Sequence, residues 1–82
     1  MSISELKSIQ ILTDKINVTP KAITNYNGFY LIMVDDTIDE YDSYYIVDID
    51  TENIVKWSPA YDLEGYLNII KNNSFKRIWV RR

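Results

Sequence analysis

Hydrophobic positions near the N-terminus repeat with helical spacing. Five aliphatic side chains fall on one half of a helical wheel turned by about 100° per residue: Ile3, Leu6, Ile9, Leu12 and Ile16. The pattern predicts a helix over residues 3–16, with Ser2 or Ser4 as its N-cap. Ile11 lies outside this arc, and the alternation over residues 8–11 also fits a strand.

Residues 21–34 combine two apolar runs with a tight-turn signal between them. Asn27 and Gly28 both accept the positive φ that a two-residue type I′ turn requires. We therefore predict a hairpin with strands at residues 21–26 and 29–34. The second strand, FYLIMV, is apolar on both faces, which is typical of a central strand covered on both sides or packed under a helix.

Two further strands follow a polar connection over residues 35–42. Alternation over residues 43–49 predicts a third strand. The inward face of this strand is expected to consist of alternate side chains: Tyr45, Val47 and Ile49. The composition of residues 50–53 predicts a turn, and residues 54–57 predict a fourth strand.

A serine followed by a proline marks the start of a second helix, with Ser58 as the cap and Pro59 in the first helical position. The apolar stripe of this helix has i, i+3, i+4, i+7 spacing: Leu63, Tyr66, Leu67 and Ile70. Gly65 destabilises the helix by roughly 1 kcal/mol relative to alanine, and could let it lie close to a sheet. The helix is expected to end at Asn72, before a last strand at residues 75–80.

The predicted order of elements is α-β-β-β-β-α-β. With 82 residues, this order favours one small α+β domain over residues 1–82. We expect a mainly antiparallel sheet with two helices packed on one face, which is the simplest layered arrangement for these elements.

The composition indicates a reducing compartment. The chain has no cysteine, whereas secreted domains of this size usually depend on disulfides. The N-terminus lacks the basic and apolar regions of a signal peptide, and no apolar run approaches the ~20 residues of a membrane span. We expect a cytoplasmic protein in a bacterial host cell, without a membrane partner.

The chain lacks the residues that most catalytic chemistries require. Histidine and cysteine are absent, which removes Ser-His-Asp and Cys-His sites and nearly all zinc sites, and no phosphate-binding glycine loop is present. Asp48, Asp50 and Glu52 match the opening of a calcium loop, but Asn53 and Pro59 stand where glycine and glutamate are required. A chain this short offers little material for a cleft between paired carboxylates. We expect no enzyme activity, no catalytic residue, no metal site and no cofactor.

Charge is unevenly distributed along the chain. No lysine or arginine occurs between Lys21 and Lys56. This segment holds eight of the twelve acidic residues: Asp35, Asp36, Asp39, Glu40, Asp42, Asp48, Asp50 and Glu52. The last twelve residues carry five basic side chains and no acid. Repulsion among the acids opposes folding, which favours a role for them in binding a basic partner. An irregular cation site within residues 35–42 is an alternative.

Tyrosines among these acids favour a protein interface, because tyrosine is enriched in interface cores and charge around it speeds encounter. The predicted partner-binding residues come from this segment: Asp35, Asp36, Asp39, Glu40, Tyr41, Asp42, Tyr44, Asp48, Asp50 and Glu52. On this hypothesis the chain is a small acidic DNA mimic that blocks the basic nucleic-acid-binding surface of a host enzyme. Small phage inhibitors, such as uracil-DNA glycosylase inhibitor and several anti-CRISPR proteins, resemble it in size, acidity and lack of cysteine. The resemblance is one of composition and assigns no residues.

Two other functions stay open. A general intracellular protein–protein interaction module, or small subunit, would use an apolar and aromatic interface, with these candidate contacts: Tyr26, Tyr30, Trp57, Tyr61 and Trp79. Direct binding of nucleic acid by the basic C-terminal residues would use Phe75 and Trp79 for stacking. It is disfavoured because Lys76 and Arg77, as neighbours on a strand, point to opposite faces. The sequence indicates no oligomeric state.

Overall fold

The computed structural model describes residues 4–35 and 42–78, which form five strands and two α-helices in the predicted order. The elements are α1 (Glu5–Lys15), β1 (Thr19–Tyr26), β2 (Phe29–Asp35), β3 (Asp42–Asp48), β4 (Ile54–Trp57), the 3₁₀ helix η1 (Pro59–Tyr61), α2 (Leu63–Lys71) and β5 (Lys76–Arg77). This arrangement confirms the α+β class and the order α-β-β-β-β-α-β. Of the predicted last strand, residues 79 and 80 lie outside the described residues.

The strands form one antiparallel sheet in the order β4-β3-β2-β1-β5. The predicted hairpin between β1 and β2 is confirmed, because Asn27 and Gly28 have φ angles of 48° and 81°. Strand β5 is short and pairs with β1 through Ala22 and Ile23. Strand β4, with the predicted limits of residues 54–57, forms the other edge of the sheet.

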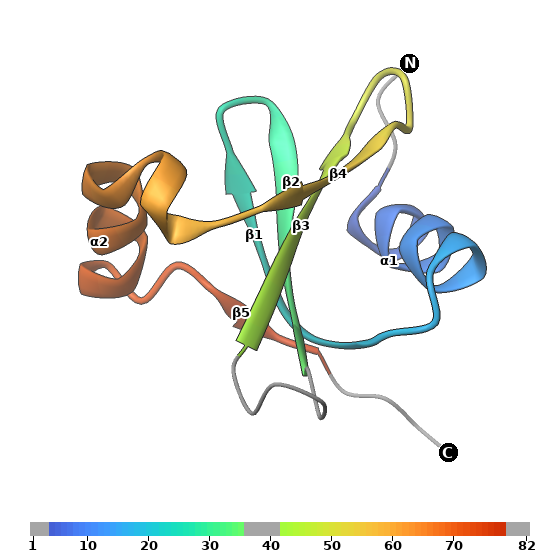
Figure 1. Ribbon diagram of the computed structural model, residues 1–82, viewed down its shortest axis with the longest axis horizontal. Coiled ribbons are helices and arrows are strands. Elements are labelled where there is room, and N and C mark those ends of the chain that lie inside the picture. Colours follow the sequence, from blue (N-terminus) through green and yellow to red (C-terminus); the bar gives the residue numbers. More distant parts are fainter. Residues whose placement is uncertain (1–3, 36–41, 79–82) are drawn as a thin grey trace.

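The two helices lie on opposite faces of the sheet, and not on one face as the sequence analysis predicted (Figure 1). Consecutive residues of β2 demonstrate this, because Leu31 packs in the cluster on the α2 side and Ile32 in the cluster on the α1 side. Both side chains are fully buried. A central strand that is apolar on both faces needs cover on both, so one helix on each face buries more of it than two helices on one.

Each face of the sheet has its own hydrophobic cluster. The α1-side cluster consists of Leu12, Ile23, Ile32, Val34 and Val47, and the α2-side cluster consists of Leu31, Tyr44, Trp57 and Ile69. Strand β3 serves both, since Tyr45 packs against the first cluster and Ile46 against the second. The prediction of a single inward face for this strand is therefore wrong, and Ile49 lies in the turn after it.

The buried face of α1 is rotated relative to the predicted one. Ser4 is the N-cap, as one of the two predicted candidates, and its hydroxyl accepts a hydrogen bond from the Lys7 amide at 3.1 Å. Ile11, which was placed outside the apolar arc, is buried at 8% exposure, whereas Leu6 is 79% exposed. Ser8 is fully buried and its hydroxyl donates to the Glu5 carbonyl at 2.6 Å. This local hydrogen bond satisfies the serine, so it can face the sheet.

The second helix begins later than predicted. Ser58 and Pro59 start the 3₁₀ helix η1, in which the Ser58 hydroxyl accepts from the Ala60 amide. The α-helix itself begins after Asp62, whose carboxylate is its N-cap. Asn72 caps its C-terminus, as expected. The break at Asp62 sets the rotation of α2 about its axis and therefore which of its apolar side chains reach the sheet.

Candidate binding surface

Helix α2 carries two apolar stripes, and only one of them faces the sheet. Tyr66 and Ile69 pack in the cluster beneath the helix. Leu63, Leu67 and Ile70 follow i, i+4, i+7 spacing and are 59%, 55% and 48% exposed. The predicted single stripe is therefore divided, because Tyr66 is half-buried against the α2-side cluster while the three aliphatic members of the stripe form a separate exposed row.

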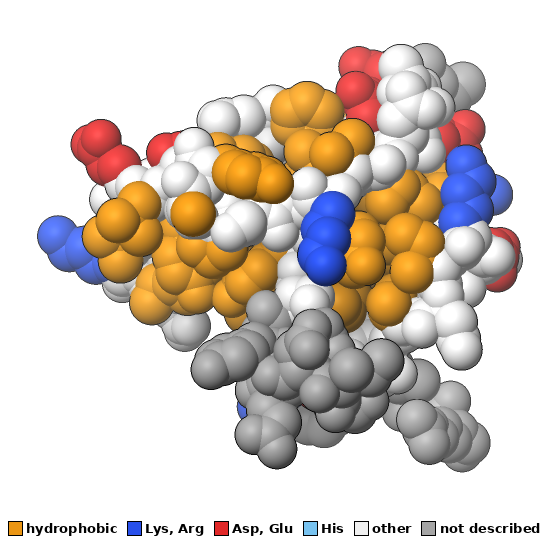
Figure 2. Space-filling view, in the orientation of Figure 1, with side chains coloured by type: hydrophobic (Ala, Val, Ile, Leu, Met, Phe, Trp, Pro, Cys, Tyr) orange, Lys and Arg blue, Asp and Glu red, His pale blue; other side chains and the backbone are white. Residues whose placement is uncertain are grey.

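Two further exposed apolar side chains lie on the same side of the sheet. Tyr61, in η1 just before the helix, is 74% exposed, and Val55 of β4 is 55% exposed. Val55 is on the α2 side because its register partner, Ile46, packs in the α2-side cluster. We call these five side chains the apolar face: Val55, Tyr61, Leu63, Leu67 and Ile70. Figure 2 shows hydrophobic side chains gathered over α2 and the neighbouring strand on this side of the molecule.

The orientation of α2 is fixed at its N-terminus by a side-chain contact with β1. The Tyr26 hydroxyl donates to Oδ2 of Asp62 at 2.5 Å, and Oδ1 of the same carboxylate accepts from the Gly65 amide at 3.1 Å. One carboxylate thus caps the helix and ties it to the sheet. One turn along, the hydroxyls of Tyr66 and Tyr44 are 2.9 Å apart and hydrogen-bonded. Leu63 lies between these two links, one residue after Asp62 and three before Tyr66, and its side chain is exposed.

The structure gives a reason for glycine at position 65 that the sequence alone did not reveal. A Cβ atom at this residue would contact the Asp62 carboxylate, with Cγ only 2.9 Å away. Real Cβ atoms essentially never make contacts shorter than 3.0 Å. Glycine at this position therefore leaves room for Asp62 to fold over the first turn of α2.

Hydrogen bonding shifts the pKa of both partners in this contact. The Tyr26 hydroxyl, and then the Gly65 amide, hold the pKa of Asp62 below its usual value, because both donate to the ionised carboxylate. The hydrogen bond to Asp62 raises the pKa of Tyr26 most, followed by burial and by repulsion from the same carboxylate. The charged carboxylate with a protonated tyrosine is therefore the favoured pair at neutral pH.

The aromatic residues proposed as contacts differ in exposure. Trp57 is buried at 6% exposure and meets Tyr26 and Tyr44 edge-on, with ring centroids 5.3 and 5.8 Å apart. It is a core residue that offers little surface to a partner. Tyr26 and Tyr30 are half-buried, and Trp79 lies outside the described residues. Tyr61 alone among the described members of that set is widely exposed.

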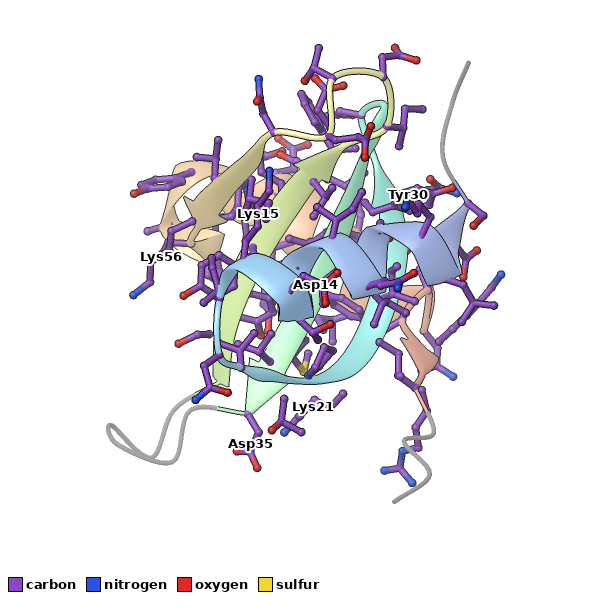
Figure 3. All side chains as sticks on the ribbon, turned by 90° about the vertical axis from the view of Figure 1, so that its right-hand side faces the viewer. Asp14, Lys15, Lys21, Tyr30, Asp35 and Lys56 are labelled. Atoms are coloured by element: carbon purple, nitrogen blue, oxygen red, sulfur yellow. The ribbon has the colours of Figure 1, made fainter. Side chains whose placement is uncertain are left out.

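Between Lys21 and Lys56, the acidic residues that the structure describes lie at opposite ends of β3. Asp35 and Asp42 are register partners at one end of the β2–β3 ladder, while Asp48, Asp50 and Glu52 belong to the turn at the other end. Figure 3 shows Asp35 and that turn at opposite ends of the sheet. Six strand rises of about 3.4 Å separate Asp42 from Asp48, which is about 20 Å. The structure therefore divides the described part of the predicted acidic surface into two groups.

Two of the predicted contact residues have structural roles. Oδ1 of Asp48 accepts from the amides of Asp50 and Thr51 at 2.8 and 3.0 Å. The Thr51 amide, followed by that of Asp50, lowers the pKa of Asp48 by stabilising its charged form. Asp48 thus stabilises the predicted turn, in which Glu52 takes a positive φ of 63°. Tyr44 is buried at 6% exposure in the α2-side cluster, which leaves little of its ring for a partner.

Four of the predicted partner-binding residues lie outside the described residues: Asp36, Asp39, Glu40 and Tyr41. Their role stays a prediction. Within residues 4–35 and 42–78, no group of three or more acidic side chains is arranged to hold a metal ion. No helix in that part of the chain is long and apolar enough to cross a membrane.

One basic C-terminal residue that the structure describes pairs with an acid of the first helix. Lys76 forms an ion pair with Glu5 of α1, with 3.2 Å between Nζ and Oε1. Both side chains are solvent-exposed, so the pair adds about 0–1 kcal/mol to stability. This contact ties the β5 edge of the sheet to the start of α1.

Comparison of the chain with protein-family models, with curated proteins and with solved structures gives no significant match.

Proposed function

We propose that this protein is a non-enzymatic protein-binding module that binds through the apolar face. The observation that carries the proposal is the exposed row of Leu63, Leu67 and Ile70 on a helix whose other apolar side is already packed. Single exposed apolar residues are common on protein surfaces. A contiguous set of them, rimmed by polar residues, is typical of an interaction site.

The rim of this surface has the expected character. Glu64, Asn68 and Lys71 alternate with the three aliphatic residues along α2 and are all exposed. A polar rim around an apolar centre is the usual anatomy of a protein interface. Tyr61 at one end supplies an aromatic side chain of the kind that contributes much of the binding energy at such sites.

The apolar face supports binding better than the acidic residues do. Its members are described, exposed and close along the chain, whereas the described acids form two groups about 20 Å apart at the ends of β3. The Asp48 carboxylate also accepts hydrogen bonds from two amides of its own turn. Inhibition of a nucleic-acid-binding enzyme by the acidic segment remains the alternative hypothesis.

The experiment compares photo-crosslinking from two exposed leucines. A photoreactive phenylalanine replaces Leu67 in one variant and Leu6 in the other, since Leu6 is 79% exposed on α1 and lies on the opposite side of the sheet. We expect irradiation to give a discrete protein adduct from position 67 and none from position 6. Loss of that adduct when Ile70→Lys is added would place the contact on α2. Equal adducts from both positions, or none from position 67, would overturn the proposal.

A further inference from the structure

Strand β4 is an open edge of the sheet that residues 4–35 and 42–78 form. It is the last strand in the order, and among the described residues its one pairing partner is β3. The Asp48 amide donates to the Asn53 carbonyl at 2.9 Å, which makes these two residues a hydrogen-bonded pair. Such pairs alternate along an antiparallel ladder, so the backbone groups of Val55 and Trp57 point toward β3. Those of Ile54 and Lys56 point outward along the open edge.

The open edge and the apolar face lie on the same side of the molecule. In the view of Figure 1, β4 crosses in front of β3 and β2. In the same view, Figure 2 shows hydrophobic side chains over α2 beside this strand. A partner that approaches from this side meets unpaired backbone groups at β4 and exposed aliphatic side chains on α2 together.

We propose that the partner at this surface is a second copy of this chain, related by a two-fold axis perpendicular to the sheet. Antiparallel pairing of β4 with the partner's β4 would extend the five-stranded sheet to ten strands. A two-fold axis in this direction keeps each helix on its own side, so the two α2 helices lie next to each other on the same face. The exposed row on one α2 would then cover the same row on the other.

The positions of the outward backbone groups limit the possible registers. In the register that we propose, Ile54 and Lys56 form hydrogen-bonded pairs with the partner's Lys56 and Ile54, which places Val55 opposite itself on the two-fold axis. The two Val55 residues form a non-hydrogen-bonded pair with Cα atoms about 4.5 Å apart. A register that placed Lys56 opposite itself would set like charges directly across from each other, which is unfavourable. The register centred on Val55 avoids this.

A second copy fits this surface better than an isolated peptide. An extended peptide could add to the β4 edge, but it would bring no helix to cover Leu63, Leu67 and Ile70. A second copy supplies both an open strand and an apolar helix row in the matching arrangement. The elements involved contain four, three and nine residues, fewer than the ~20–30 per side of a standard interface. We therefore expect a dimer with a Kd on the order of micromolar.

A charge-swap experiment tests this arrangement, because Val55 is the one position that meets itself. Analytical ultracentrifugation over a concentration series measures the dimer Kd of the parent, of Val55→Lys, of Val55→Glu and of an equimolar mixture of the two variants. We expect each variant alone to dimerise at least ~10-fold more weakly than the parent, because like charges meet on the axis. The mixture should recover most of the affinity as a heterodimer. The same pair of charges at Leu6, on α1, should leave the Kd unchanged.

A backbone test uses the open edge itself. Lys56→Pro removes an amide that points outward, so the hydrogen bonds between β3 and β4 are kept. We expect this variant to lose dimerisation, and Lys56→Ala to keep it. Circular dichroism confirms that both variants fold; if Lys56→Pro does not fold, the charge swap decides. A folded Lys56→Pro variant that dimerises like the parent overturns the inference.

This inference rests on the proposed binding role of the apolar face, but the two fail separately. A parent protein that is monomeric up to ~1 mM, or a charge-swap mixture that stays monomeric while the parent dimerises, overturns the second-copy arrangement. If position 67 then still crosslinks to a different protein, the binding role holds with another partner. If position 67 gives no adduct either, both proposals fall.

Discussion

The Tyr26 hydroxyl donates a 2.5 Å hydrogen bond to the Asp62 carboxylate, across 36 positions of the chain. The contact joins β1 to the N-terminus of α2, and the same carboxylate caps that helix through the Gly65 amide. Because α2 carries the exposed apolar row, the contact determines which side of the helix is presented to a partner. Stability and the proposed binding surface therefore depend on the same two residues.

The stability supplied by this pair should depend on pH. The pKa of Asp62 is lowered in the folded state, so its contribution is present above the unfolded-state pKa and is lost as pH falls through the folded-state pKa. The pKa of Tyr26 is raised, so its contribution is present below its unfolded-state pKa and is lost as pH rises through the folded-state value. We expect Tyr26→Phe to destabilise the protein at pH 7 and much less at pH ~2.

Urea unfolding of the parent and of Tyr26→Phe at both pH values measures this difference. The comparison cancels the titration of Asp48, whose pKa is also lowered, since that turn is the same in both proteins. A stability difference of equal size at pH 7 and at pH ~2 would mean that the phenol contributes through packing and not through its bond to the charged carboxylate.

Replacement of Gly65 should have the opposite effect from that usual in a helix. Glycine to alanine normally stabilises a helix interior by about 1 kcal/mol. Here the new Cβ would press on the Asp62 carboxylate, so the cap or the bond to Tyr26 must give way. We expect Gly65→Ala to lower the free energy of unfolding by about 1–3 kcal/mol, the usual cost of overpacking. Asn68→Ala, at an exposed position of the same helix, is the control and should be neutral or slightly stabilising in the same urea titration.

The division of the aromatic residues into core and surface predicts two different phenotypes. Trp57→Ala removes a side chain that is 6% exposed and packed against Tyr26 and Tyr44, so it should cost about 3–5 kcal/mol of stability. Tyr61→Ala removes a side chain that is 74% exposed, so stability should change by no more than about 0.5 kcal/mol. Thermal unfolding measures the first effect, and the crosslinking yield from position 67 measures the expected loss of binding for Tyr61→Ala. A stable Trp57→Ala variant would contradict the structure at this point.

The boundaries of the strands could be predicted where local residues determine a turn. Asn27 and Gly28 determine the hairpin because few other residues accept positive φ at both positions. The pairing of β1 with β2 follows from this turn, whereas the pairing of β5 with β1 joins residues far apart in the chain. The placement of the helices could not be derived in the same way, although the two apolar faces of β2 contained a signal for it. Leu31 and Ile32 point to opposite sides, and each needs its own cover.

The candidate surface was harder to predict, for a related reason. Periodicity reveals that Leu63, Leu67 and Ile70 share one side of a helix. An apolar side of a helix is usually predicted to be buried in the core. Tyr66 and Ile69 occupy the core here because the Tyr44 hydroxyl bonds that of Tyr66 and because Asp62 fixes where the helix begins. The Tyr44–Tyr66 bond, and the Tyr26–Asp62 bond that holds the capping carboxylate, join residues far apart in sequence. The exposed row therefore becomes visible only when the tertiary contacts are known.

The acidic residues and the apolar face make opposite predictions about charge. If the apolar face is the binding surface, changing exposed acids to amides should leave binding intact. Asp35→Asn, Asp50→Asn and Glu52→Gln are suitable changes because these side chains are exposed and none belongs to α2. We expect the triple variant to give the parent's crosslinking yield from position 67, and Leu63→Ser with Ile70→Ser to abolish it.

Salt provides the matching control for that comparison. Binding by the apolar face should change little between 50 and 500 mM salt, because burial of aliphatic side chains is not screened by ions. Binding by the acids should weaken over the same range as their attraction to a basic partner is screened. The opposite result would be a crosslinking yield that falls with salt and in the triple amide variant but is unchanged by the two serine substitutions. That result would make the acidic segment the functional surface, and the exposed row on α2 would have no role in binding.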